Sequence, residues 1–422
     1  MIENLKKNFE NFNKKFISWP NNNRDKFFKK FIEMGFPNNK IEDWKFSNFN
    51  NFVSKNFKSL NTNVENLTTF KFDKYINSFD HNKIIFVNGE FKDKNFGNEE
   101  KEKFVFSDIK GFGEHLRLTI EDECENSLNL LNNAFYLDGL SLIIEKEYEF
   151  KKPLIIYNVF KTKKENNFFN QKIKIKVGEN SKIDILLLNI NLGSEPIFLN
   201  IYNNLSLKKD AVLKLYSSSD LGEKDIFYNF NNVDVLSNSI FENFIFSNSA
   251  NFYKNEIKCS LNEKYSSSFI NGAIFSQNEQ THEIKSRIEH NDENTKSYQK
   301  IKSVLDKKSK SVFQGKIFVD SKAQKTDGYQ LSKAILLDEE SEFDSKPELE
   351  IYADDVKCSH GSTSGNLDED AIFYLMSRGL SEFEAKKLLI KGFLNDAVET
   401  ITNNEIRKYF SSKIESKISE YR

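Results

Sequence analysis

A nine-residue unit that recurs about every 30 residues constrains the fold of this chain more than any other feature. Each copy has an apolar residue, two or three polar residues, a small residue and then alternating apolar positions. The clearest copies begin at Val177, Leu207 and Val235, which are 30 and 28 residues apart. Related units occupy residues 305–313, 319–325 and 337–343. Short strands joined by polar corners at a near-constant period predict stacked coils, because one coil cannot bury its apolar face alone. A β-sandwich with coincidental spacing is the alternative.

Both ends of the chain have helical spacing instead. Leu5, Phe9 and Phe12 recur every three to four residues near the N-terminus. Near the C-terminus, Ser381–Glu384 matches a capping box, and an apolar stripe follows from Ala385 to Ala397. We therefore predict a mainly β protein, a β-solenoid between helical ends. The expected regions are an N-terminal helical region at 1–80, a parallel β-helix core at 81–365 and a C-terminal helical region at 366–422.

Composition excludes several classes of function. The chain of 422 residues has 61 Lys and Arg against 63 Asp and Glu, so no basic excess indicates nucleic acid as a partner. No apolar run approaches the roughly 20 residues that span a bilayer, and the N-terminal sequence lacks the apolar core of a signal peptide. The three cysteines are widely spaced and odd in number, which argues against a disulfide framework. These features predict a cytoplasmic protein without a membrane partner.

Motifs of common enzymes are absent from the sequence. Gly315-Lys316 lacks the other residues of a phosphate-binding loop, so we expect this chain to bind no nucleotide and ATP hydrolysis to come from another chain. His282 and His290 share the parity of one predicted strand. Eight residues of strand span roughly 26 Å, too far for two ligands of one metal ion. Each of these two histidines is expected to be a surface or packing residue.

Cys358-Ser-His360 is the strongest candidate for metal chemistry. If 352–360 is a strand, then Asp354, Cys358 and His360 face the same way. A thiol and an imidazole two residues apart can both reach one iron or zinc ion. Two ligands make an incomplete site, so a partner or a cluster would have to supply more. A buried cysteine beside a solvated histidine is the alternative interpretation.

The same segment resembles a known family. Residues 349–380, together with 314–319 and 323–330, are similar to the signature of the SufB/SufD family of iron–sulfur cluster assembly proteins. Lys40–Phe46 is similar to an N-terminal element of the SufD branch. The resemblance is dense from 281 to 401 and sparser before that.

Two positions favour the SufD branch over the SufB branch. This chain reads Ser-His-Gly-Ser-Thr at 359–363, where SufB proteins read Glu-His-Glu-Ala-Thr. It also has Leu331 after Gln330, where SufB proteins carry a cysteine. The main departures from the family pattern are Ser362 in place of alanine and Phe46 in place of tyrosine, and neither changes a proposed ligand.

The resemblance implies a fold, partners and a cargo. The implied fold is a right-handed parallel β-helix between helical ends. The implied partners are a SufB-type sister subunit and a SufC-type ATPase that docks on the C-terminal helices. The implied role is that of a scaffold and not an enzyme, with iron or a nascent iron–sulfur cluster held transiently and shared with SufB. By position, His360, Cys358 and Asp354 would be the contribution of this chain.

Candidate docking residues for the ATPase come from the apolar stripes of the C-terminal helices. They are Ala371, Leu375, Leu388, Leu389 and Phe393. Two other functions remain open at this stage. The chain could be a purely structural partner of SufB with no metal role. It could also be a β-helix enzyme that acts on polysaccharides, although such enzymes are secreted and a signal peptide would be expected.

Overall fold

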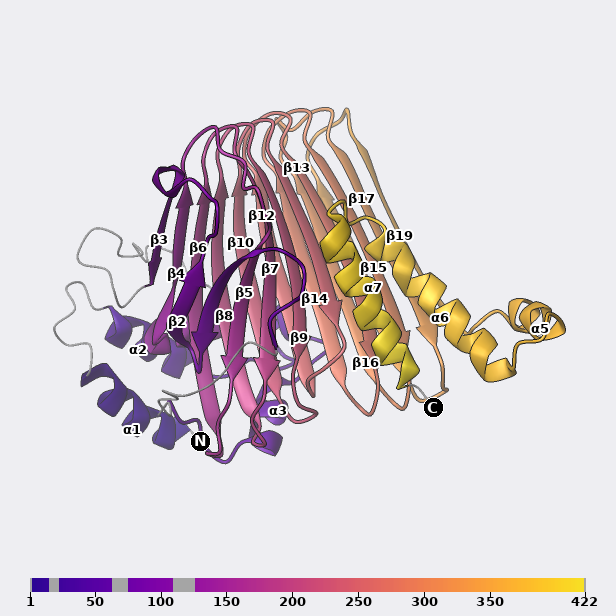
Figure 1. Ribbon diagram of the computed structural model, residues 1–422, viewed down its shortest axis with the longest axis horizontal. Coiled ribbons are helices and arrows are strands. Elements are labelled where there is room, and N and C mark those ends of the chain that lie inside the picture. The colour runs from indigo at the N-terminus through magenta and orange to yellow at the C-terminus, as the bar shows by residue number, and fades with distance from the viewer. Residues whose placement is uncertain (1, 15–22, 63–74, 109–125, 421–422) are drawn as a thin grey trace.

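The computed structural model describes residues 2–14, 23–62, 75–108 and 126–420. These residues form a β-solenoid with helices at both ends, and its coils are stacked along the long axis of the molecule (Figure 1). The mainly β, parallel solenoid that the repeats predicted is confirmed. No helix in the described ranges is long and apolar enough to cross a membrane.

Two sheets form the solenoid, and successive strands alternate between them. We name each sheet after its last strand. The β19 sheet has the order β19-β17-β15-β13-β11-β9-β7-β5-β1-β2, and the β18 sheet has the order β18-β16-β14-β12-β10-β8-β6-β4-β3. The pairs β1/β2 and β3/β4 are antiparallel, and every other pair that joins neighbouring coils is parallel.

The strands of the β19 sheet are β1 (Asn82–Val87), β2 (Glu90–Asn95), β5 (Leu154–Phe160), β7 (Lys182–Asn191), β9 (Val212–Asp220), β11 (Ile240–Ser247), β13 (Ser267–Ser276), β15 (Lys296–Leu305), β17 (Asp327–Leu336) and β19 (Lys357–Gly365). Those of the β18 sheet are β3 (Phe104–Asp108), β4 (Asp138–Ile144), β6 (Asn167–Val177), β8 (Ile197–Leu207), β10 (Ile226–Val235), β12 (Phe252–Leu261), β14 (Thr281–His290), β16 (Lys310–Val319) and β18 (Glu342–Ile351). The helices are α1 (Ile2–Asn13), α2 (Arg24–Met34), the short η2 (Glu42–Trp44), α3 (Phe49–Asn56), the short η4 (Lys101–Lys103), α4 (Ser127–Phe135), α5 (Glu369–Ser377), α6 (Glu382–Val398) and α7 (Asn404–Ser419).

The repeated unit corresponds to one corner of each coil. Asn180, Asp210 and Asn238 occupy equivalent corner positions and have positive φ angles of 54°, 57° and 57°. Asn and Asp tolerate this left-handed conformation better than most residues do. The amide of Asn180 donates to the carbonyl of Lys209 on the next coil, at 3.1 Å. The small residue after each corner is fully buried, because the next coil stacks directly on it.

Helices cover the outer faces of both sheets. The N-terminal helices pack on the β18 sheet, where Trp44 and Phe49 contact Phe252. Helices α6 and α7 lie across the β19 sheet, and Phe410 packs edge-on against Phe244 (Figure 1). The capping box at the start of α6 is confirmed, since Ser381 and Glu384 each bond the other's backbone amide. Helix α5 differs, because it projects beyond the end of the solenoid (Figure 1).

Candidate functional site at the open end of the solenoid

The solenoid ends in two strands that have a neighbour on one side only. Within the described residues, β18 pairs with β16 and β19 pairs with β17, and neither has a further strand beyond it. Side chains along most of β18 are half-buried, whereas the equivalent inward positions of earlier strands are fully buried. An open strand edge presents unpaired backbone N–H and C=O groups, and it is a natural template for another chain.

Cys358 and His360 both belong to this open end. In the register of β19 on β17, Cys358 lies beside Gly328 and His360 beside Gln330. Gly328 and Gln330 are buried inside the solenoid, so the two candidate residues share the inward face of the last strand. His360 is exposed there because no further coil covers it.

The thiol of Cys358 is the more enclosed of the two donor groups. Cys358 is half-buried and packs against the apolar cluster that includes Ile317 and Val319 of β16. Burial raises the pKa of the Cys358 thiol, and the nearby Asp327 raises it further, whereas a hydrogen bond from the Gly328 amide opposes this shift. A raised pKa disfavours the thiolate, which is the form that binds metal ions. Cys358 is therefore the less ready ligand of the pair.

The strand predicted at 352–360 is wrong at its start. Strand β19 begins at Lys357, and Asp354 lies in the bend before it, exposed and off the strand face that carries His360. The physical reason is the stacking of corners. The amide of Lys325 donates to the carbonyl of Asp355, and Gln324 Oε1 accepts from the amide of Asp355, so these residues form the next corner. Strand β19 then runs without interruption from Lys357 to Gly365.

The described residues offer no complete metal site. No group of three or more His, Cys, Asp or Glu side chains among them is arranged to hold a metal ion. Cys358 and His360 provide two donors at a surface that is open on one side. Iron–sulfur clusters commonly take four protein ligands and non-haem iron commonly takes three, so a cargo held here would need further ligands from outside the described residues.

His282 and His290 are packing residues. Both lie inside the solenoid on β14, and both have 0% exposure. His282 contacts Ser247 Oγ through Nδ1 at 3.0 Å, and His290 contacts Thr295 Oγ1 through Nδ1 at 2.7 Å. Burial lowers the pKa of His282 to about 4 and that of His290 to about 3. These two histidines stabilise the fold in their neutral forms.

The lowered pKa values of His282 and His290 predict that the folded chain loses stability in acid. Below about pH 6.5 the unfolded chain binds protons at these two histidines while the folded chain does not, so stability falls as the pH falls towards 4. Each histidine should contribute a slope of about 1.4 kcal/mol per pH unit. Urea unfolding of wild type and His282→Gln between pH 6 and pH 5 measures how the free energy of unfolding depends on pH. That dependence should be weaker in the variant by the contribution of one histidine. Equal slopes would show that His282 is protonated in the folded state.

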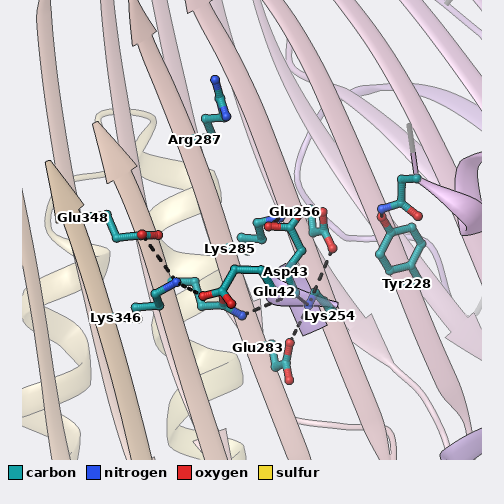
Figure 2. A network of polar contacts seen from close by, with 12 residues as sticks. Glu42, Asp43, Tyr228, Lys254, Glu256, Glu283, Lys285, Arg287, Lys346 and Glu348 are labelled. Carbon is teal, nitrogen blue, oxygen red and sulfur yellow. Dashed lines mark hydrogen bonds and ion pairs between the residues drawn. The ribbon is translucent and has the colours of Figure 1, made fainter. Parts of the chain in front are cut away.

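The Glu-Asp-Trp motif of the N-terminal region is fixed to the outer face of the β18 sheet (Figure 2). Lys254 is the centre of this attachment and is fully buried. Its ammonium donates to the carbonyl of Asp43 at 2.8 Å, lies 2.8 Å from the carboxylate of Glu283 and sits 3.8 Å from the ring centre of Trp44. A buried cation of this kind needs such partners, because removal from water is costly.

Two further ion pairs extend the attachment towards the open end. Lys285 contacts Asp43 at 2.7 Å, and Lys346 of β18 pairs with Glu42 (Figure 2). The motif therefore bridges β12, β14 and β18. Between the motif and the sheet lies a polar groove of about 870 Å³. Lys285 and Lys346 of its floor pair with carboxylates of the same groove, so we interpret these contacts as a structural attachment.

The predicted docking residues are distributed over α5 and α6 and differ in exposure. Leu388 is 49% exposed, whereas Ala371, Leu375 and Leu389 are half-buried. Phe393 packs against the β19 sheet, with the ammonium of Lys302 4.5 Å from its ring centre.

The largest exposed apolar side chains in this region were not predicted. Phe373 is 74% exposed and Tyr374 is 57% exposed, and Met376 and Phe383 are also exposed. We name the exposed set Phe373, Tyr374, Met376, Phe383 and Leu388 the α5–α6 patch. A signal was present in the sequence, because residues 371–376 are apolar without interruption, and a helix that is apolar on every side cannot be an ordinary surface helix.

Two protein-family models match this chain. Residues 160–393 match the model described as SUF system FeS cluster assembly, SufBD core domain. Residues 2–156 match the SufBD protein N-terminal region. The chain belongs to the SufB/SufD family of iron–sulfur cluster assembly proteins.

Relatives place the chain with SufD-type members of that family. It is 22% identical to the iron–sulfur cluster assembly protein SufD of Escherichia coli over 400 residues, which are 92% of this chain and 90% of that protein. It is 31% identical to SufD of Bacillus subtilis over 145 residues, or 34% of this chain and 33% of that protein. A SufBD family protein of Synechocystis is 42% identical over 100 residues, which are 24% of this chain and 22% of that protein. The resemblance to the SufD branch is confirmed.

Proposed function

We propose that this chain is a cytoplasmic scaffold subunit of iron–sulfur cluster assembly, and not an enzyme, that pairs with a SufB-type subunit through its open end. The observation that carries the proposal is the coincidence of two features. The open edges of β18 and β19 lie at the same end of the solenoid as Cys358 and His360, which are two residues apart on the inward face of β19. A partner that pairs with these edges would also cover the inward faces of both strands.

In this proposal Cys358 and His360 contribute to a transient iron or nascent cluster site at the shared edge. A neutral imidazole is a good iron ligand near pH 7, and His360 is accessible to a cargo that arrives from the partner side. The partner would provide the remaining ligands. Because Asp354 lies off the strand face, the donor pair in this proposal is Cys358 and His360.

We further propose that a SufC-type ATPase docks on the α5–α6 patch. Three of its side chains, those of Phe373, Tyr374 and Met376, belong to α5, and this helix projects beyond the solenoid end, where a second protein can reach it (Figure 1). The chain has no phosphate-binding loop of its own, so any ATP-driven rearrangement of the assembly would be transmitted through this contact. Because the chain belongs to the SufB/SufD family, we set aside the alternative of a β-helix enzyme that acts on polysaccharides.

Reconstitution of the assembly tests the proposal as a whole. The purified chain, a SufB-type subunit and a SufC-type ATPase from the same organism should elute together from a gel-filtration column, and the complex should retain iron after incubation with ferrous iron and sulfide. The chain alone should retain little, because no three donors of a metal site come together among its described residues. A chain that elutes alone at micromolar concentrations of both partners contradicts the proposal.

A further inference from the structure

The groove beside the N-terminal motif extends beyond the ion pairs that hold the motif in place. Its floor crosses six neighbouring strands of the β18 sheet, from Tyr202 on β8 to Glu348 on β18. Neighbouring strands lie about 4.8 Å apart, so the groove is about 24 Å long. A single phosphate or carboxylate group would cover only one or two of these strands. An extended polypeptide rises about 3.3 Å per residue, so about seven residues would fill the same length.

Three cations lie side by side on the floor of the groove. Lys258 of β12, Arg287 of β14 and Lys316 of β16 occupy the same register position on adjacent strands. We name these three residues the basic ladder. Like charges directly opposite each other destabilise a sheet, so three in a row cost stability unless anions lie among them. A sheet with a purely structural role has reason to avoid such a ladder.

Carboxylates of the chain neutralise the basic ladder only in part. Arg287 contacts Glu289 at 2.7 Å, and Lys316 contacts Glu350 at 2.5 Å, but neither carboxylate lines the groove. Lys258 is exposed and has no ion pair within the described part of the chain. Figure 2 shows Arg287 apart from the ion pairs that hold the N-terminal motif. The ladder can therefore accept anions that enter the groove.

The rest of the groove offers apolar contacts. Met34 and Ile41 of the N-terminal region line its wall and are 49% and 40% exposed. Methionine side chains are adaptable and are frequent at surfaces that bind varied partners. Phe230 adds a half-buried aromatic ring on the floor, stacked on Tyr202 with the ring centres 5.7 Å apart. A ligand that fills the groove would meet cations on the floor and apolar side chains beside them.

Carboxylates on the same floor argue against a continuous chain of phosphates. Glu256 of β12 and Glu348 of β18 both line the groove. A nucleic acid carries a negative charge on every nucleotide, so its backbone would meet like charge at these positions. A peptide can place carboxylates at the ladder and uncharged residues elsewhere. The mixed floor therefore favours a peptide over a nucleic acid, in agreement with the absence of a basic excess in the chain.

We propose that this groove binds an extended acidic segment of a partner protein, with carboxylates on the basic ladder and apolar side chains against Met34 and Ile41. The groove reaches β18, the last strand of its sheet, so a bound segment holds its protein close to the open end of the solenoid. The contact is small and should be weak and reversible, as is usual below about 1,200 Å² of buried surface. It does not depend on the proposed function and can be measured on the isolated chain.

A fluorescein-labelled peptide of about eight residues, with glutamate and leucine in alternation, is the probe. Its fluorescence anisotropy during titration with the full chain gives the Kd. The Kd should rise between about 50 and about 300 mM salt, because salt screens exposed ion pairs. The same peptide with glutamine in place of glutamate should bind at least about ten-fold more weakly, since hydrogen bonds between charged groups are the strong ones. Arg287→Gln should weaken binding of the acidic peptide by a similar factor.

Lys174→Gln is the matched control. Lys174 lies in the register of the basic ladder, three strands away on β6, and does not line the groove. Its loss removes one cation from the outer face of the same sheet, so the affinity for the acidic peptide should stay at the wild-type value. Acetylation of the wild-type chain with acetic anhydride needs no variant. The bound peptide should protect Lys258 and Lys316 from acetylation and leave Lys174 reactive.

Each contrary outcome identifies a different error. Equal affinity for the glutamate and glutamine peptides, or unchanged affinity in Arg287→Gln, overturns the inference. Displacement of the acidic peptide by an equal concentration of inorganic phosphate would show a site for small anions, and tighter binding of a single-stranded oligonucleotide of the same length would show a nucleic-acid groove. Either result excludes an acidic segment as the occupant. None of these measurements involves iron, so the inference and the proposed function can fail separately.

Discussion

A double change of Phe373→Asp and Leu388→Asp should reduce binding of the ATPase subunit by at least about 100-fold. A buried aromatic anchor such as Phe373 contributes about 2 kcal/mol or more to an interface, and the new carboxylate at residue 388 would be buried without a partner. Phe373 is 74% exposed and Leu388 is 49% exposed in the isolated chain. The change should therefore leave the free energy of unfolding within about 0.5 kcal/mol of wild type. Isothermal titration calorimetry with the purified ATPase measures the affinity, and urea unfolding measures the stability.

Two comparison variants make this experiment specific. Tyr265→Asp places the same charge on another aromatic side chain, 58% exposed at a distant corner, and it should leave ATPase binding unchanged. Phe393→Ala should mainly lower stability, because Phe393 packs on the β19 sheet. Unchanged affinity in the double variant would mean that the ATPase docks elsewhere. Truncation after Gly365 is a poorer test, because it would also remove α6 and α7 and expose the sheet that they cover.

The solenoid could be predicted from the sequence because its corners repeat. A left-handed residue followed by a small buried residue is required at each turn, so the pattern at Asn180 returns at Asp210 and Asn238. The last corner was misplaced for a physical reason. Ile351–Val356 alternates like a strand, yet its conformation is determined by hydrogen bonds to Gln324 and Lys325 of the preceding coil. Such long-range stacking is invisible in a local pattern.

The parts of the site that sequence reasoning missed depend on contacts between distant residues. The side chain of Gln330 crosses the interior to the carbonyl of Glu348 because Gly315 of the opposite sheet leaves room for its amide. In the sequence, Lys254 is an ordinary polar residue of an alternating strand. In the structure it is covered by the N-terminal motif, which lies more than 200 residues earlier in the sequence. Periodicity predicts which face a residue is on. It cannot predict which segment will pack over that face.

The N-terminal motif also stabilises the open end of the solenoid, through its ion pair with β18. A terminal strand with one neighbour is easily frayed, because half of its backbone groups lack partners. Lys346 of β18 is fixed from outside by Glu42, and its neighbour Glu348 is held from inside by Gln330. The last strand of the β18 sheet is thus braced on both faces before any partner arrives. A preformed edge reduces the ordering cost of association.

His360→Ala should reduce iron retention by the reconstituted complex by at least about ten-fold, because even outer-shell changes at metal sites cost about 10- to 100-fold. Folding and assembly with the partners should be nearly unaffected, since His360 is exposed at the open end. Cys358→Ser should have a smaller effect on iron, because burial already raises the pKa of this thiol and disfavours the thiolate. Iron per complex after desalting is the measurement for both variants.

Ser362→Ala is the matched control for the histidine change. Ser362 is the next inward residue of β19, two positions beyond His360, and its hydroxyl contacts Ser332 Oγ at 3.0 Å. Its loss removes a polar group from the same face of the same strand without touching the candidate donors, so iron retention should stay at the wild-type level. Equal losses in Ser362→Ala and His360→Ala would mean that both changes act by disturbing the shared edge. Full iron retention in His360→Ala would identify His360 as a structural residue of the open end, and the iron ligands would then have to come from the partner.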